Sequence, residues 1–248
     1  MNQSTPLLGI LGGLGPMSTF YFCELLTAHT KAICDADHID MIISSRASTP
    51  DRTAFILGRS ERDPLPIMQE EARRLEQAGA SLLVIPCNTA HYFYDGLRAE
   101  CSVPILNIIE ETVSFLHKSG TKKFGLLATD GTVRSGSYDR VCAQYGMTCV
   151  TPDGEGQAAV MSIIYDSIKQ NKPVDLDALL QVADQLRKMG CERIVLGCTE
   201  LSLLNKSHRL DDFIFLDSLE VLAYKTILSC QKEPIGFPKS FDRKEEHV

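Results

Sequence analysis

Two cysteines of this chain stand just after short apolar runs that are typical of buried strands. Cys87 follows the run 82–85, and Cys198 follows the run 194–196. A helical pattern ending at a glycine precedes each run, and each glycine lies eight residues before its cysteine. One cysteine at the end of a strand is ordinary. Two at the same point of a repeated unit predict a symmetric site with a thiol on either side.

The residues that follow these cysteines argue against a purely structural role. Most buried cysteines are small packing residues, and that interpretation suits Cys23, Cys142 and Cys191. A packing cysteine does not need polar neighbours, yet both cysteine turns have them. The neighbours are Asn88 and Thr89 after Cys87, and Thr199 and Glu200 after Cys198.

Two thiols facing each other across a cleft suit the inversion of an acidic carbon. One base removes a proton from one face while an acid returns a proton to the other, so the substrate need not turn over. A free cysteine titrates near ~8.5, and a helix N-terminus can lower that value. Both cysteines lie at strand-to-helix turns, where we expect exposed amides to stabilise the thiolate. Covalent catalysis is the alternative, but it leaves the second cysteine without an obvious role.

Metal and dinucleotide sites are weaker interpretations of the same motifs. Cys87 and His91 are four residues apart, but Cys198 has no histidine or second cysteine at ligand spacing, and no CxxC occurs. The first glycine turn has Ser18 where a dinucleotide fingerprint needs glycine or alanine. We therefore expect neither a metal nor a nucleotide cofactor.

Strand and helix patterns alternate along the chain, which predicts an α/β fold with parallel sheets covered on both faces. Strands are expected at 7–11, 40–44, 82–85, 103–109, 121–128, 148–150, 194–196 and 213–216. Helices are expected at 17–31, 66–78, 110–119, 136–145, 158–169, 176–189 and 219–229. Ligands of such sheets bind beyond the carboxyl ends of the strands, where the glycine turns and both cysteines should converge on one cleft.

The glycine turns indicate an internal duplication. Gly9 and Gly15 are six residues apart, as are Gly125 and Gly131, and the offset between the pairs is close to that between the two cysteines. Two such halves favour a pseudo-twofold pair of α/β domains over a solenoid. We expect the first domain to comprise residues 1–113 plus 212–248, and the second residues 114–211. The tail from Gln231 is expected to be frayed.

Composition narrows the class of protein. The chain is 44% hydrophobic and 23% charged, with a net charge of −7 and no basic patch suited to nucleic acid. No apolar run has the length of a membrane span, and the N-terminus lacks the pattern of a signal peptide. Nine cysteines without disulfide-scaffold spacing fit a reducing compartment, so a cytoplasmic protein with free thiols is expected.

Six motifs together resemble the aspartate/glutamate racemase family, and among its members the aspartate racemases most closely. They span roughly residues 8 to 225 in the order found in the family. The motifs are 12–16 (GGLGP), 50–53 (PDRT), 86–91 (PCNTAH), 127–132 (LATDGT), 164–169 (IYDSIK) and 197–201 (GCTEL). The resemblance implies cofactor-independent racemisation, with no pyridoxal phosphate and no metal, and by analogy a homodimer.

The resemblance also assigns roles to individual residues. Cys87 and Cys198 match the two catalytic bases, the first serving the D-enantiomer and the second the L-enantiomer. Because both are kept, reversible racemisation is expected. The positions that hold the α-carboxylate and amino groups of the substrate are Asn88, Thr89 and Thr199.

Further matches concern the remaining substrate contacts. Met17 and Thr129 match contact positions, although Met17 could equally pack at the start of its helix. Arg52 and Lys169 match the cations that bind the side-chain carboxylate of aspartate, whereas most such residues elsewhere are solvated surface charges. Arg46 is an additional cation, expected near the cleft, that many family members lack.

Several functions remain open at this point. Glutamate or a broader range of amino acids could be the substrate. Related decarboxylases and cis–trans isomerases tend to use a single cysteine, which two intact cysteine turns argue against. A non-catalytic module that binds acidic amino acids is the alternative from a different class of protein.

Overall fold

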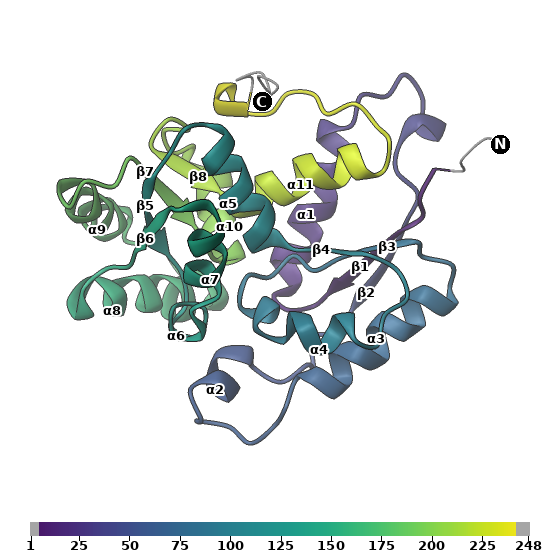
Figure 1. Ribbon diagram of the computed structural model, residues 1–248, viewed down its shortest axis with the longest axis horizontal. Helices are drawn as coiled ribbons and strands as arrows, with labels where there is room; N and C mark the ends of the chain where they lie inside the picture. The colour runs from purple at the N-terminus through teal and green to yellow at the C-terminus, as the bar shows by residue number, and fades with distance from the viewer. Residues whose placement is uncertain (1–4, 242–248) are drawn as a thin grey trace.

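The computed structural model describes residues 5–241 as two four-stranded parallel sheets surrounded by helices (Figure 1). The strand orders are β2-β1-β3-β4 and β6-β5-β7-β8, which correspond position by position. This arrangement confirms the predicted α/β fold with two domains. The strands are β1 (Leu8–Gly12), β2 (Met41–Ser45), β3 (Leu82–Val84), β4 (Ile105–Leu106), β5 (Lys123–Leu127), β6 (Thr148–Val150), β7 (Arg193–Leu196) and β8 (Phe215–Asp217).

Helices connect and cover these strands, as right-handed crossovers between parallel strands require. The inner strands of each sheet pair with neighbours on both sides; they are β1 and β3 in the first sheet and β5 and β7 in the second. The helices are α1 (Pro16–His29), α2 (Arg52–Ile56), α3 (Leu65–Gln77), α4 (Tyr94–Arg98), α5 (Ile108–Lys118), α6 (Asp130–Ser135), α7 (Ser137–Tyr145), α8 (Gly154–Ser162), α9 (Leu176–Lys188), α10 (Thr199–His208) and α11 (Ser218–Ser229).

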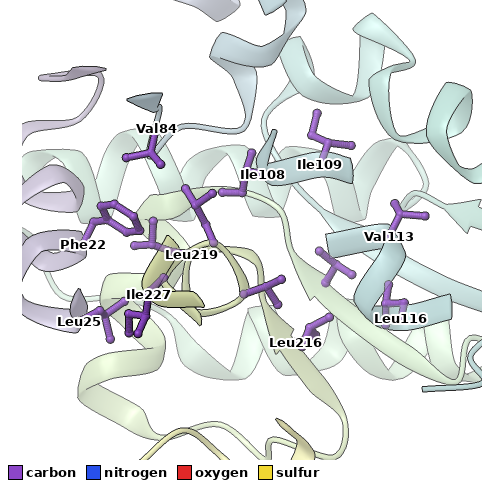
Figure 2. Close-up of a cluster of buried hydrophobic side chains, with 14 of the residues drawn as sticks. Phe22, Leu25, Val84, Ile108, Ile109, Val113, Leu116, Leu216, Leu219 and Ile227 are labelled. Atoms are coloured by element: carbon purple, nitrogen blue, oxygen red, sulfur yellow. The ribbon is translucent and has the colours of Figure 1, made fainter. Parts of the chain in front are cut away.

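One hydrophobic core joins the two sheets. Helix α11 packs against both α1 and α5, and these helices lie between the sheets (Figure 1). Figure 2 shows side chains from both halves in this core, among them Phe22 of α1, Val84 of β3 and Leu216 of β8. Each sheet also has a separate cluster on its other side. Burial of apolar area in the shared core therefore fixes the two halves against each other.

The structure corrects the expected domain boundary at residue 212. Strand β8 pairs with β7 in the second sheet, with Ile194 opposite Phe215. Helix α11, which follows directly, packs back onto α1 of the first half. The reason is that the edge of β7 that faces away from β5 needs a paired strand. β8 takes that position, as β4 does beside β3 in the first sheet.

Two predicted elements differ more than the others from their bounds in the structure. The strand expected at 103–109 is reduced to β4, because Asn107 caps α5 and its Oδ1 accepts hydrogen bonds from the amides of Ile109 and Glu110. The helix expected at 158–169 begins earlier, at Gly154, with Asp153 as its N-cap. It ends in a π-helical turn, Ile163–Ser167, followed by a 3₁₀ turn at 168–170.

The tail is ordered further than expected. The Ile235 amide donates to the His29 carbonyl oxygen at 2.8 Å, and the Lys31 amide donates to that of Glu233 at 2.9 Å. Phe241 is buried in the shared core. The prediction of fraying is therefore wrong for residues 231–241, and the rest of the tail lies outside the described residues. Within residues 5–241, no helix is long and apolar enough to cross a membrane.

Candidate active site

A narrow pocket lies between the two halves and collects most of the predicted site residues. Eight of the nine line it, and only Met17 does not. Its lining consists of Leu14, Asp51, Arg52, Thr53, Cys87, Asn88, Thr89, Thr129, Tyr165, Lys169, Cys198, Thr199 and Glu200. A larger cavity beside the 236–241 segment contains no cysteine and none of these residues.

Cys87 lies in a tight turn after β3, and His91 holds that turn in place. Nδ1 of His91 is 2.8 Å from the carbonyl oxygen of Cys87, and the Ile108 amide donates to Nε2 at 3.3 Å. Since Nε2 accepts, the ring is neutral and carries its proton on Nδ1. Both ring nitrogens are engaged with the backbone, so Cys87 and His91 do not form the metal-ligand pair that their spacing allowed.

The burial of His91 makes the stability of the fold depend on pH. Burial lowers the pKa of His91 from 6.5 to about 4. The His91 ring therefore binds a proton more readily in the unfolded chain than in the folded protein. The contribution of His91 to the free energy of unfolding is complete above pH 6.5 and is lost as the pH falls toward 4. We expect a loss of about 3 kcal/mol in the free energy of unfolding across that window. Urea titrations at several pH values should show it.

The matched variants for this measurement are His91→Asn and His117→Asn, the second at an exposed position. His91→Asn should flatten the stability profile between pH 6.5 and 4, whereas His117→Asn should leave its slope intact. An unchanged slope in His91→Asn would refute the assignment.

Cys198 is the N-cap of α10 and belongs to a chain of hydrogen bonds that includes a residue not predicted from sequence. Its Sγ donates to Oε2 of Glu200 at 2.9 Å, and Nζ of Lys169 donates to Oε1 of the same carboxylate at 2.6 Å. Glu200 is buried, with 6% of its surface exposed. Sequence reasoning noted Glu200 only as a polar neighbour, because its partner Lys169 lies far away in the sequence.

The pKa values of the Cys87 and Cys198 thiols are both raised, but the charged groups beside the two thiols differ. Burial raises the pKa of Cys87, and the Arg52 guanidinium opposes this. Burial also raises the pKa of Cys198 well above its usual value, and the Glu200 carboxylate adds to the effect. The prediction that helix N-termini lower these pKa values is therefore wrong, because desolvation outweighs the backbone amides.

Lys169 reaches the pocket from the irregular end of α8. The π-helical turn and the 3₁₀ turn place both Tyr165 and Lys169 on the pocket wall. Burial lowers the pKa of Lys169, but Glu200 and Cys198 raise it more, so the net shift is upward. Tyr165 also connects the halves, since its hydroxyl donates to Oδ2 of Asp51 at 3.3 Å.

Arg52 opens α2 and is buried, with 9% of its surface exposed. Nη1 donates to the carbonyl oxygen of Pro50 and Nη2 to that of Leu14, both at 3.0 Å. Nε is buried and has no hydrogen-bond partner among the described residues. A guanidinium has five N–H donors, so the Nε and Nη2 side can still bind a carboxylate bidentately.

Hydroxyl and amide groups complete the lining of the pocket. Thr89 Oγ1 lies 2.9 Å from the hydroxyls of both Thr129 and Thr132. Asn88 is fixed between two groups of the second half, accepting from Tyr138 at 2.8 Å and donating to Ser218 at 3.0 Å. These contacts place neutral donors from both halves beside Cys87.

Two expected contacts lie outside this pocket. Met17 is 63% exposed at the start of α1, in an adjacent hollow that shares Lys169 and Glu200 with the pocket. Arg46 turns away to α3, where its Nη1 donates to Glu71 Oε1 at 2.6 Å. The sequence predicts Arg46 as an additional cation near the cleft, but its guanidinium is not available there, because the carboxylates of α3 bind it.

Comparison with known proteins shows which class of protein this fold and site belong to. The family model for Asp/Glu/Hydantoin racemase matches residues 11–225, and the chain belongs to that family. The chain is 29% identical over 225 residues to the broad specificity amino-acid racemase RacX of Bacillus subtilis, covering 89% of this chain and 96% of RacX. The structure of Picrophilus torridus aspartate racemase is similar with a TM-score of 0.80 and 31% identity, covering 93% and 96% of the two chains.

Glutamate racemases are also similar, over a shorter stretch. The enzyme of Pasteurella multocida is 33% identical over 155 residues, which is 60% of this chain and 57% of that protein. These results together define an amino-acid racemase, that is, an isomerase.

Proposed function

We propose that the protein racemises aspartate without a cofactor, using Cys87 and Cys198 as bases on opposite faces of Cα. The observation that carries this proposal is the convergence of two buried cysteines, one from each half, on a pocket that also contains Arg52 with a free Nε donor. The similarity to an aspartate racemase supports the choice of substrate. A cytoplasmic homodimer remains our prediction for its state in the cell.

The proposed reaction moves two protons and changes no oxidation state. With L-aspartate bound, the Cys198 thiolate takes the Cα proton, and the electron pair spreads into the α-carboxylate. The Cys87 thiol then donates its proton to the opposite face, which yields D-aspartate and a Cys87 thiolate. Asn88, Thr89 and Thr199 are the donors we assign to the α-carboxylate, where negative charge develops.

A chiral assay over the standard L-amino acids, without added cofactor, tests this proposal. L-Aspartate should give D-aspartate, and in D₂O the Cα hydrogen should be replaced by deuterium. Binding of aspartate without any exchange would identify a non-catalytic binding module instead.

A broader substrate range is the second candidate, and the charge of the pocket favours it. Two cations, Arg52 and Lys169, line the pocket together with two carboxylates, Asp51 and Glu200. Lys169 is thus already neutralised in part, and RacX, a relative of nearly full coverage, is named for broad specificity. Comparable kcat/KM values for aspartate, glutamate and neutral amino acids would support this candidate over aspartate alone.

The first glycine turn provides a prediction about the position of Glu200. A Cβ atom added to Gly15 would lie 2.7 Å from Oε1 of Glu200, closer than any normal contact. Gly15→Ala should therefore displace this carboxylate from Cys198 and Lys169 and lower racemisation at least ~10-fold. Gly120→Ala is the matched control, since Gly120 also has a positive φ but a Cβ atom there meets nothing within 4 Å. Equal activity of the two variants would show that the position of Glu200 is unimportant.

A further inference from the structure

Glu200 lies between the sulfur of Cys198 and the ammonium group of Lys169, and each of its oxygens has one of these partners. Oε2 accepts from Sγ at 2.9 Å, and Oε1 accepts from Nζ at 2.6 Å. The thiol therefore carries its proton and the carboxylate is ionised. A proton acceptor for Cys198 is thus already within hydrogen-bond distance, restrained by a cation on its other oxygen.

Lys169 can pair with either of two carboxylates in this pocket, that of Glu200 or the side-chain carboxylate of a bound substrate. Its side chain is 26% exposed, whereas that of Glu200 is 8% exposed. Lys169 also lines both the pocket and the adjacent hollow that contains Met17, so it can approach a ligand without leaving its helix turn. In a desolvated site, a carboxylate that loses its ammonium partner binds a proton more tightly.

We propose that Glu200 accepts the proton of Cys198 when Lys169 moves from Glu200 to the side-chain carboxylate of the substrate. An acidic substrate thereby activates the base that deprotonates it. Glu200 is a positioning and proton-accepting residue that acts through Cys198, and it need not touch the substrate. This inference rests on the proposed racemase function and adds a reason for selecting acidic substrates.

The step is balanced in protons and charge. The S–H bond of Cys198 breaks and an O–H bond forms at Oε2, which leaves a thiolate and a neutral Glu200. The ammonium of Lys169, no longer paired with Glu200, is paired with the substrate carboxylate. The Cys198 thiolate then removes the Cα proton, and the Cys87 thiol protonates the opposite face. When product leaves, the proton held by Glu200 passes in net terms to the Cys87 thiolate, and the Glu200 carboxylate binds Lys169 again.

Exchange of the Cα hydrogen in single-cysteine variants isolates the action of Glu200. In Cys87→Ser, exchange of L-aspartate in D₂O reports Cys198 alone, and in Cys198→Ser, exchange of D-aspartate reports Cys87 alone. Adding Glu200→Gln should slow the first exchange at least ~30-fold more than the second. Asp184→Asn, which removes an exposed carboxylate from its pair with Lys188, is the matched control and should change neither. Equal losses in both backgrounds would overturn the proposal.

Alanine and acetate together contain the groups of aspartate in two separate molecules. Their combined use provides a readout that would not change if Glu200 and Lys169 had only a structural role. Alanine lacks the side-chain carboxylate, so its Cα exchange should be slow and should rise at least ~10-fold on addition of acetate. Chloride at the same concentration should have no such effect. Lys169→Met and Glu200→Gln should each abolish the stimulation by acetate.

Absence of acetate stimulation in a wild-type protein that racemises aspartate would overturn this inference alone. Absence of any exchange with any amino acid would instead refute the proposed function. Thermal unfolding of each variant separates these outcomes from loss of the fold.

Discussion

Serine in place of either Cys87 or Cys198 is expected to lower aspartate racemisation at least ~1,000-fold, because inversion needs a base on each face of Cα. A serine hydroxyl is far less acidic than a thiol, so it neither forms the anion nor returns a proton readily. Both positions are buried in the same pocket, which leaves little room for water to replace either group. Circular dichroism or a coupled chiral assay can follow the reaction from either enantiomer.

The two variants should differ in the enantiomer whose Cα hydrogen they still exchange. Cys87→Ser retains Cys198 and should exchange L-aspartate, whereas Cys198→Ser should exchange D-aspartate. NMR in D₂O measures both. Cys34→Ser, at an exposed cysteine outside the pocket, is the control and should remain fully active. If Cys87→Ser or Cys198→Ser kept full activity in both directions, the two-base mechanism would be wrong.

Arg52→Lys is expected to lower kcat/KM for aspartate about 100-fold while lowering that for alanine about 10-fold or less. Lysine keeps the positive charge but lacks the planar fork, so it cannot offer the Nε and Nη2 pair to a carboxylate. Hydrogen bonds to charged groups of this kind contribute about 1.5–3 kcal/mol each. The rate with alanine measures the loss of activity that comes from disturbing the glycine turn at Leu14, since Nη2 also donates to the Leu14 carbonyl oxygen.

Arg46→Lys is the matched control for this substitution. Arg46 belongs to the same segment of the chain, but its guanidinium is paired with Glu70 and Glu71 of α3. We expect no change in the ratio of aspartate to alanine rates. An equal loss of both rates in Arg52→Lys would assign Arg52 to the loop or to the α-carboxylate rather than to substrate selection.

The sequence by itself determined the architecture and most of the pocket. Apolar runs ending at polar turns place Cys87 and Cys198 beyond parallel strands, since side chains at strand ends of such sheets meet at one edge. The matching glycine turns indicated two similar halves, as the corresponding strand orders confirm. Local patterns suffice for these features because strand ends, glycine turns and helix caps depend on neighbouring residues.

Other features of the site were decided only by the tertiary structure. Glu200 meets Lys169 because α10 and the irregular end of α8 pack together, and no spacing in the sequence records that contact. The sequence likewise predicted lowered pKa values for the cysteines, whereas burial in the assembled pocket raises them. Desolvation and ion pairing depend on what surrounds a group in space. The two thiols are therefore alike in their sequence pattern but differ in the charges that face them, Arg52 at Cys87 and Glu200 at Cys198.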